Sequence, residues 1–200
     1  MDFFTSDHHL GHFKICEYAD RPFDGVAEMD LALIDAWNGA VGPSDTVYHM
    51  GDFCLGSTSM AGRYFSLLNG TICILAYPWH HDRLWLPVDG SLGVPTASSH
   101  AHLRSSMVVL EYREHGDGKY PLHVVLCHYP IARWDRSHYG SIHLHGHSHG
   151  RFSQPGRSLD VGVDSAYKLT GKYQPLSLDF VLEYMKDKEM HPPRAQWQGR

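Results

Sequence analysis

Imidazole side chains recur at every second position along one stretch, Ser141–Gly150, as His143, His145, His147 and His149. Neutral imidazole is the commonest protein ligand for metal ions near pH 7. The apolar Ile142 and Leu144 predict a short strand, and the glycine-flanked turn after it would bring His147 and His149 together at a sheet edge. We interpret these two histidines as metal ligands. Taken alone, the stretch also fits a histidine-rich polar loop that binds no metal.

Further acidic and imidazole side chains follow the ends of other predicted strands, namely Asp7 and His9, Asp52, His80 and His81, and His128. Open α/β sheets place their binding sites at such strand ends. A structural zinc site would favour closely spaced cysteines, whereas this set of carboxylates and imidazoles suits Mn, Fe, Ni or Zn. The sequence therefore predicts a metal site assembled from several loops. His8 alternates with the ligand positions, so we expect its side chain to face the other way.

The elements that must position these residues begin with a strand–helix–strand–helix–strand succession. Strands are predicted at Met1–Ser6, Thr46–Met50 and Thr71–Ala76. The first helix runs from a cap at Asp24 to Val41, and the second is marked by apolar positions at Met60, Tyr64 and Leu68. This order of elements predicts parallel strand pairing with right-handed crossovers.

The second half of the chain begins with Pro87–Ser105, which shows no period and is expected to be a long loop beside the site. Strands are then predicted at Met107–Tyr112, Leu122–Cys127, Ser141–His145 and Leu159–Val163. The first two of these flank a turn and predict an antiparallel hairpin. Ser177 is the expected N-cap of a C-terminal helix.

The composition bounds the class of protein. The 200 residues suffice for one domain, which we place at residues 1–185, followed by a loose polar tail over 186–200. With 42% hydrophobic and 20% charged residues and a net charge of −5, the chain has the composition of a soluble globular protein. Because no basic run stands out, we expect no strong binding to nucleic acid.

The cysteines and the N-terminus bear on the compartment. None of the four cysteines lies in a CxxC pair, so buried free thiols in a reducing compartment are favoured over disulfides. The N-terminus lacks the basic and apolar regions of a signal peptide, and no apolar run approaches the ~20 residues of a membrane span. We therefore expect a cytoplasmic protein with no membrane partner.

Together, the motifs resemble those of the calcineurin-like metallophosphoesterases. The family pattern is Asp-x-His, then Gly-Asp, then Gly-Asn-His-Asp/Glu, then a lone His, then Gly-His-x-His. The matching segments here are Asp7-His8-His9, Gly51-Asp52, Trp79-His80-His81-Asp82, His128 and Gly146-His147-Ser148-His149. The segments FTSDHHLGH, RPF and LHGHSHG also resemble those of the small, single-domain bacterial and phage-type branch of this family.

The resemblance implies a fold, a cofactor and a reaction. The fold would be a four-layer αββα sandwich of two mixed β-sheets flanked by helices. Two divalent ions would have as ligands Asp7, His9 and His149 for the first, His128 and His147 for the second, and Asp52 for both. A hydroxide bridging the ions would attack a phosphomonoester or phosphodiester. His81 would act as general acid, with Asp82 behind it to fix its ring and favour its protonated form.

The chain departs from the family pattern at one motif, where Trp79-His80 replaces Gly-Asn. Glycine serves where the backbone needs a positive φ, so we expect this loop to be rebuilt. Two alternatives follow for His80. It either replaces the asparagine as a ligand of the second metal, or it points away and leaves that metal weakly bound. Trp79, His12 and Arg83 are candidate substrate-binding residues, each of which also fits a plain structural or surface role.

Two other function classes compete with the phosphoesterase. A metallo-β-lactamase-like hydrolase needs a compact His-x-His-x-Asp-His cluster, which this sequence lacks. A non-catalytic metal-binding or regulatory protein, descended from a phosphoesterase, would follow if Trp79 and His80 alter the second metal site. For the enzyme we expect a small phosphoester or nucleotide-like substrate. The motifs fit a monoester and a diester equally well, and they fit any oligomeric state.

Overall fold

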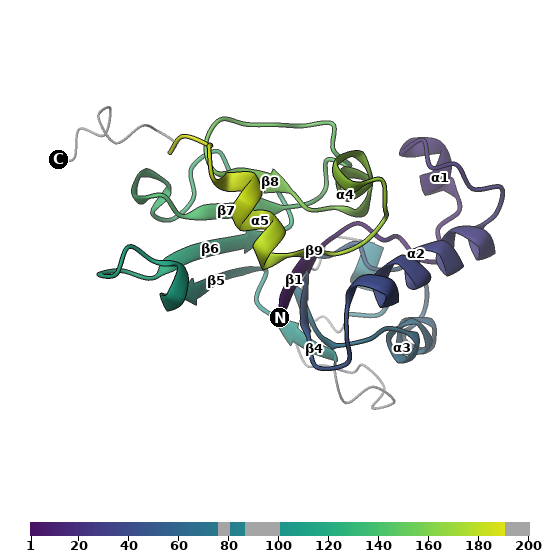
Figure 1. The fold of residues 1–200 in the computed structure, drawn as a ribbon. Helices are drawn as coiled ribbons and strands as arrows, with labels where there is room; N and C mark the ends of the chain where they lie inside the picture. The colour runs from purple at the N-terminus through teal and green to yellow at the C-terminus, as the bar shows by residue number, and fades with distance from the viewer. Residues whose placement is uncertain (76–80, 87–100, 191–200) are drawn as a thin grey trace.

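The structure, a computed structural model, describes residues 1–75, 81–86 and 101–190 and contains two mixed β-sheets with helices around them (Figure 1). The first sheet has the strand order β4-β3-β2-β1-β9. Its strands are β1 (Asp2–Thr5), β2 (Thr46–His49), β3 (Thr71–Leu75), β4 (Ala101–Arg104) and β9 (Leu176–Ser177). The second sheet has the order β5-β6-β7-β8, with strands β5 (Met107–Tyr112), β6 (Leu122–Cys127), β7 (Ile142–His145) and β8 (Ser158–Asp160).

Four strands of the first sheet run parallel, as the alternation of strands and helices predicts for β1, β2 and β3. Phe3 pairs with Val47, and Val47 in turn pairs with Ile72 on β3. Strand β4 continues the parallel set, and β9 closes the other edge in antiparallel orientation. Because parallel strands end at the same sheet edge, the C-terminal ends of β1, β2 and β3 lie side by side. Asp7 and Asp52 follow β1 and β2, and His81 begins the 3₁₀ helix His81–Leu84, the next described element after β3.

The second sheet combines both pairing modes. Strands β5 and β6 form the predicted antiparallel hairpin, with Met107 opposite Cys127. Strands β6, β7 and β8 are parallel, with Val124 paired to Ile142. The ends of β6 and β7 therefore lie at one edge, and the segments that leave them carry His128 and His147.

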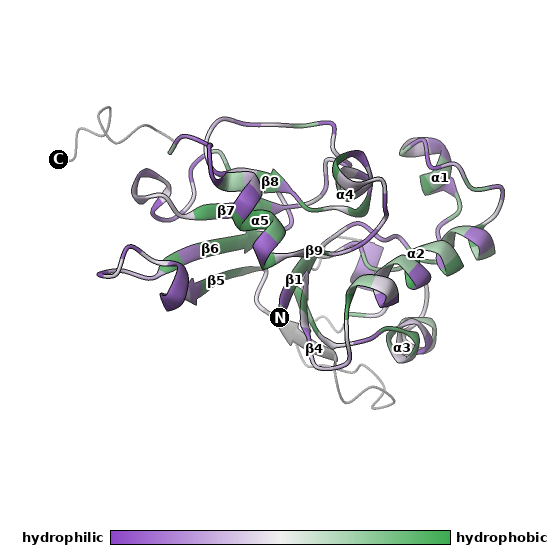
Figure 2. Ribbon diagram, in the orientation of Figure 1, coloured by the Kyte–Doolittle hydropathy of each residue, from purple (hydrophilic) through white to green (hydrophobic). Residues whose placement is uncertain are grey.

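Alternating side chains of β1 connect two cores. Phe3 packs with apolar residues of the helices that cover the first sheet, including Leu33 and Trp37. Phe4 points the other way and joins a core that contains Val124 and residues of β7, so this core lies between the two sheets. Hydrophobic residues accordingly run along β1, β6 and β7 (Figure 2). The prediction of an α/β sandwich of two mixed sheets flanked by helices is confirmed.

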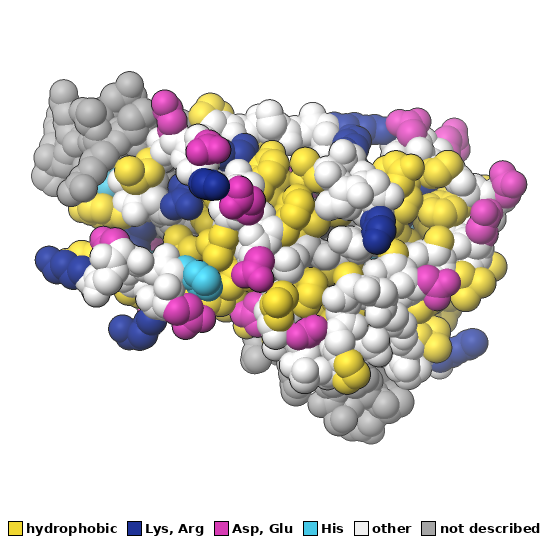
Figure 3. All heavy atoms as spheres, in the orientation of Figure 1, with side chains coloured by type: hydrophobic (Ala, Val, Ile, Leu, Met, Phe, Trp, Pro, Cys, Tyr) yellow, Lys and Arg dark blue, Asp and Glu magenta, His cyan; other side chains and the backbone are white. Residues whose placement is uncertain are grey.

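The helices are α1 (Lys14–Tyr18), α2 (Val26–Ala40), α3 (Thr58–Leu67), α4 (Val163–Thr170) and α5 (Leu178–Met185). The first three contribute to the core on the outer face of the first sheet, whereas α5 contributes to the core between the sheets. The Ser177 cap is confirmed, since its hydroxyl accepts a hydrogen bond from the Phe180 N–H at 3.2 Å. On the face seen in Figure 3, basic side chains are scattered among acidic ones.

Several predicted boundaries were wrong. The first long helix begins at Val26 with Gly25 at the cap, and Asp24 instead donates its N–H to the Glu28 carboxylate. The predicted loop Pro87–Ser105 contains strand β4, a four-residue edge strand too short to show a period; residues 87–100 lie outside the described part. Val163 begins helix α4 and does not end a strand.

Three further predictions concern the cysteines, a membrane span and the C-terminal tail. All four cysteines are buried and free, as predicted. Among the described residues, no helix combines the length and apolar character that crossing a membrane requires. Residues 191–200 of the predicted tail lie outside the described part.

Candidate metal centre

Backbone hydrogen bonds fasten the site-bearing loops to one another. The N–H groups of Asp7 and His9 donate to the carbonyls of Gly51 and Asp52, at 3.1 and 2.9 Å. The loop after β1 is thereby locked against the loop after β2. Likewise the Gly146 N–H donates to the His128 carbonyl at 2.9 Å, which joins the segments after β6 and β7.

Asp7, His9 and His149 form a first group of candidate ligands. One possible ligand atom from each lies within 4.8 Å of those of the other two. Asp7 is fully buried, and its Oδ2 accepts the His147 backbone N–H at 2.9 Å. Within the described part of the chain, Asp7 Oδ1 and both ring nitrogens of His9 make no hydrogen bond. Buried polar atoms rarely lack a hydrogen-bond partner. These three atoms are therefore free to bind a metal ion.

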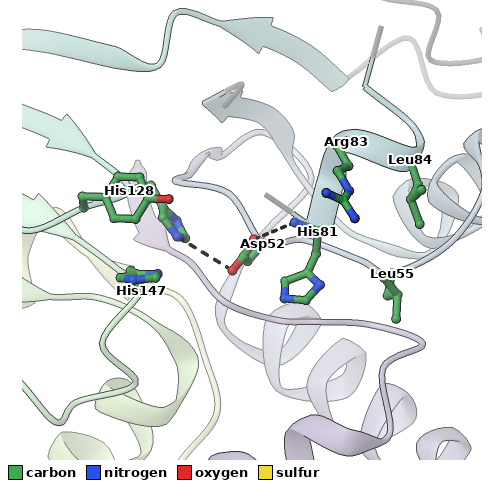
Figure 4. A pocket seen from close by; sticks show the side chains of 8 residues that line it. Asp52, Leu55, His81, Arg83, Leu84, His128 and His147 are labelled. Carbon is green, nitrogen blue, oxygen red and sulfur yellow. Dashed lines mark hydrogen bonds and ion pairs between the residues drawn. The ribbon is translucent and has the colours of Figure 1, made fainter. Parts of the chain in front are cut away.

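Asp52, His128 and His147 form a second group with the same 4.8 Å spacing. His128 Nδ1 donates to the Met50 carbonyl at 3.0 Å, which turns Nε2 toward the site, 3.8 Å from Asp52 Oδ2. Figure 4 shows this approach of the two side chains. The same carboxylate oxygen lies 3.5 Å from Nε2 of His9 in the first group. Asp52 therefore stands between the two groups, at the place where a shared ligand would lie.

Several residues of the site have the left-handed backbone conformation, which residues other than glycine rarely adopt. Among the described non-glycine residues, positive φ values occur at Asp20 and Arg136 and at five members of the two groups, namely Asp7, His9, Asp52, His147 and His149, with φ from 51° to 68°. Each such residue costs on the order of 1–3 kcal/mol, and this strain clusters at functional sites. The concentration of strain in these five residues supports a functional role for the site.

Two glycines leave room for the Asp7 carboxylate. A Cβ at Gly146 would lie 2.2 Å from Ser6 Oγ and 2.4 Å from Asp7 Oδ2. A Cβ at Gly162 would lie 2.6 Å from the same oxygen of Asp7. Gly146, which the sequence marks as the end of the histidine strand, thus allows the turn to close onto Asp7.

The electrostatics of the bare site suit a cation. Burial, reinforced by the charges of Asp160 and Asp52, raises the pKa of Asp7 well above its ordinary value. Burial also lowers the pKa of His9, with Arg21 and His149 acting in the same direction, so that His9 is neutral and able to bind a metal. A divalent ion would offset the repulsion among the carboxylates. The donor set and its charge therefore fit metal ions.

An ion pair that sequence reasoning missed supports the first group. Asp164 Oδ2 accepts His149 Nδ1–H at 2.6 Å, while Arg21 binds both Asp164 oxygens at 2.8 and 2.9 Å. Arg21 also donates to the carbonyls of Asp7 and His8, at 2.6 and 2.8 Å. Burial opposes ionisation of Asp164, but the hydrogen bonds from His149 and Arg21 outweigh it and hold its pKa below the ordinary value. Such partners orient a ligating histidine and fix its tautomer.

The two predicted catalytic residues lie in different environments. His81 lines a pocket of about 270 Å³ together with Asp52, and its backbone N–H donates to Asp52 Oδ1 at 3.3 Å (Figure 4). The prediction that Asp82 orients the His81 ring was wrong. Its Oδ1 instead accepts the backbone N–H groups of Phe53 and Cys54 and the indole N–H of Trp85. Burial, with the nearby charge of Asp52, raises the Asp82 pKa to about 7. Asp82 thus holds the loop that carries Asp52.

The three candidate substrate-binding residues lie in different places relative to the site. Arg83 lines the pocket beside His81. His12 stands next to the first group, with its ring centroid 5.7 Å from that of His9. Trp79 and the predicted ligand His80 lie outside the described residues. Tyr129 also lines the pocket, with its ring 4.6 Å from that of His147, and nothing in the sequence pattern singled it out.

His8 faces away from both groups, as predicted. Its Nδ1 lies 3.0 Å from Nε2 of His49 in the buried layer beneath the site.

Comparisons with known proteins place the chain among relatives of similar length. The Gene 66 protein of Mycobacterium phage D29 is 30% identical over 209 residues, covering 93% of this chain and 96% of the relative. The Gene 66 protein of Mycobacterium phage L5 is 27% identical over 197 residues, covering 84% and 89%. An uncharacterized protein of Methanocaldococcus jannaschii is 28% identical over 193 residues, covering 92% and 90%.

A solved structure shares the fold. The crystal structure of a protein of unknown function from Aquifex aeolicus aligns with a TM-score of 0.61 at 16% identity, covering 92% of this chain and 98% of that one. No protein-family model matches the chain.

Proposed function

The chain belongs to the same family as the Gene 66 protein of Mycobacterium phage D29, and we propose that it is a phosphoesterase that depends on two divalent metal ions. The observation that carries this proposal is the position of Asp52. Its Oδ2 lies 3.5 Å from His9 Nε2 in one three-ligand group and 3.8 Å from His128 Nε2 in the other. The arrangement of the groups agrees with the resemblance of the motifs to the calcineurin-like metallophosphoesterases.

The metal ions would supply the electrophilic part of the chemistry. When bound, two divalent ions would polarise the phosphoryl oxygens and lower the pKa of a water molecule between them. The two groups contain two carboxylates, Asp7 and Asp52, against four imidazoles. Two ions of charge +2 would thus leave a net positive site, which favours an anionic ester. This mixed set of carboxylates and imidazoles suits Mn, Fe, Ni or Zn.

His81 and Arg83 would act on the substrate from the pocket side. Both line the same pocket as Asp52, and His81 is fixed through its backbone to the Asp52 carboxylate. We assign His81 as the general acid that gives its proton to the leaving oxygen. The Arg83 guanidinium would hold a non-reacting phosphoryl oxygen through charged hydrogen bonds. The substrate class is a small phosphoester or nucleotide-like molecule.

Turnover of chromogenic esters tests the proposal. p-Nitrophenyl phosphate and bis-p-nitrophenyl phosphate are assayed with Mn, Ni and Zn, using wild type and the variants Asp52→Asn and His81→Ala. Asp52→Asn should abolish turnover, and His81→Ala should lower kcat by roughly 10²–10⁴-fold. His115→Ala, in an exposed 3₁₀ turn away from the site, is the matched control. Tight metal binding without turnover of either ester or of a wider phosphoester panel would favour the non-catalytic metal-binding alternative.

We further propose a cytoplasmic location, because the four buried free cysteines fit a reducing compartment.

A further inference from the structure

Beside the two groups lies a third cluster of imidazoles, formed by His9, His12 and His81. One ring nitrogen from each lies within 4.8 Å of those of the other two. The ring centroids are 5.7 Å apart for His9 and His12, 4.9 Å for His9 and His81, and 5.0 Å for His12 and His81. The catalytic roles proposed above use His9 as a ligand and His81 as an acid, and they make no use of His12.

Three nitrogens of this cluster make no hydrogen bond within the described residues. His9 is 2% exposed, and within the described residues neither of its ring nitrogens makes a hydrogen bond. The buried Nδ1 of His12 likewise has no hydrogen-bond partner there. Burying such atoms without partners is costly, so their convergence points to a ligand that accepts lone pairs, which means a metal cation.

The loop that carries His12 is held in place independently of any ligand. The His12 N–H donates to the His9 carbonyl at 3.0 Å, which closes a turn between the two histidines. Within that turn, the Gly11 N–H donates to both carboxylate oxygens of Asp30, at 3.0 and 3.2 Å. Tyr64 in turn donates its hydroxyl to Asp30 at 2.6 Å. The backbone at His12 is therefore fixed by hydrogen bonds before any metal binds.

We propose that His9, His12 and His81 form a further metal-binding group, which holds a zinc ion when His9 is not engaged by Asp7 and His149. Three neutral imidazoles with an open fourth position are a ligand set that zinc uses, whereas manganese prefers oxygen ligands. His9 belongs to both sets and is the residue through which they compete. On the proposed function, an ion in this group occupies the His81 ring and removes the general acid, so zinc would slow the reaction. That consequence rests on the proposed function; the binding group itself does not.

Zinc stoichiometry tests the group without any substrate. His149→Ala removes one ligand of the first group and leaves the imidazole cluster and the second group complete. After chelator treatment and dialysis against buffered zinc, His149→Ala should retain two zinc ions per chain. Adding His12→Ala should lower the count to one, whereas adding His115→Ala, an exposed histidine outside the site, should leave it at two.

Two results would overturn the proposal. One is a count of one ion in His149→Ala alone; the other is a count of two that persists after His12→Ala is added. His12→Gln serves as a second version of the variant, and circular dichroism establishes that each protein is folded. Because the count needs no turnover, failure of the ester assays would refute the phosphoesterase and leave this result standing.

Discussion

His149 Nδ1 lies 2.6 Å from Asp164 Oδ2, so a residue of helix α4 fixes the ring of a candidate metal ligand in the loop after β7. Arg21 binds the other side of the same carboxylate and also contacts the carbonyl of Asp7. A single ion pair thus holds two of the three members of the first group. The metal affinity of that group should depend on a residue that does not itself bind the metal.

Asp164→Asn should therefore weaken metal binding selectively in the first group. Loss of the carboxylate removes the charge that orients His149, and such changes lower metal affinity by roughly 10–100-fold. A metal titration that resolves two binding steps should show one step weakened and the other unchanged. Asp179→Asn, at an exposed carboxylate in α5, is the control and should alter neither step. Equal weakening of both steps would mean that Asp164 supports the fold in general.

Gly146→Ala should disturb both stability and the Asp7 carboxylate. The added Cβ would lie 2.2 Å from Ser6 Oγ and 2.4 Å from Asp7 Oδ2, so the turn must shift. We expect the free energy of unfolding in urea to fall by about 1–3 kcal/mol, together with weaker binding in the first group. Gly39→Ala is the matched control, because a Cβ there meets nothing within 4 Å and a helical alanine adds up to ~1 kcal/mol. Similar stability of the two variants would show that the turn at Gly146 is looser than described.

The pH dependence of stability should include a contribution from His143. This buried ring donates from Nδ1 to the Val125 carbonyl and accepts the Ile131 N–H at Nε2, so protonation would break the second bond. Burial lowers the His143 pKa to about 4, below its value of about 6.5 in the unfolded chain. The unfolded state therefore binds more protons between these values, and stability is lost as the pH falls through this window.

The size of this contribution can be isolated by a variant. The free energy of unfolding is measured from pH 7 to pH 4 for wild type and for His143→Gln, which cannot titrate. The wild type should lose on the order of 3 kcal/mol more than the variant over that range. Other titrating groups cancel in the difference. Parallel curves for the two proteins would contradict the assignment.

The candidate ligands could be predicted because their signal is local. Asp7, Asp52 and His128 each follow a recognisable apolar strand, and the parallel order of strands and helices brings such positions to one edge. The alternation of His147 and His149 around a glycine turn was equally visible. Each of these residues is identified by two local features, its side-chain type and its position shortly after a strand.

The supporting residues could not be predicted, because their roles depend on distant pairing. Arg21 and Asp164 are 143 positions apart, and although Asp164 directly follows the predicted strand Leu159–Val163, nothing in the local sequence pairs it with Arg21. The error at Asp82 has the same origin. Adjacency to His81 in the sequence suggested a shared role, but the 3₁₀ helix His81–Leu84 turns Asp82 inward to the backbone of Phe53 and Cys54. Short elements such as α1, β4 and β9 offered too few residues for a period to be detected.

The most direct test of the account is the position of the metal ions in a crystal grown with Mn²⁺. Anomalous scattering should reveal two peaks about 3.5–4 Å apart, one against Asp7, His9 and His149 and the other against His128 and His147, with Asp52 contacting both. A single peak, or two peaks that share no Asp52 oxygen, would contradict the shared-carboxylate centre on which the proposed function depends.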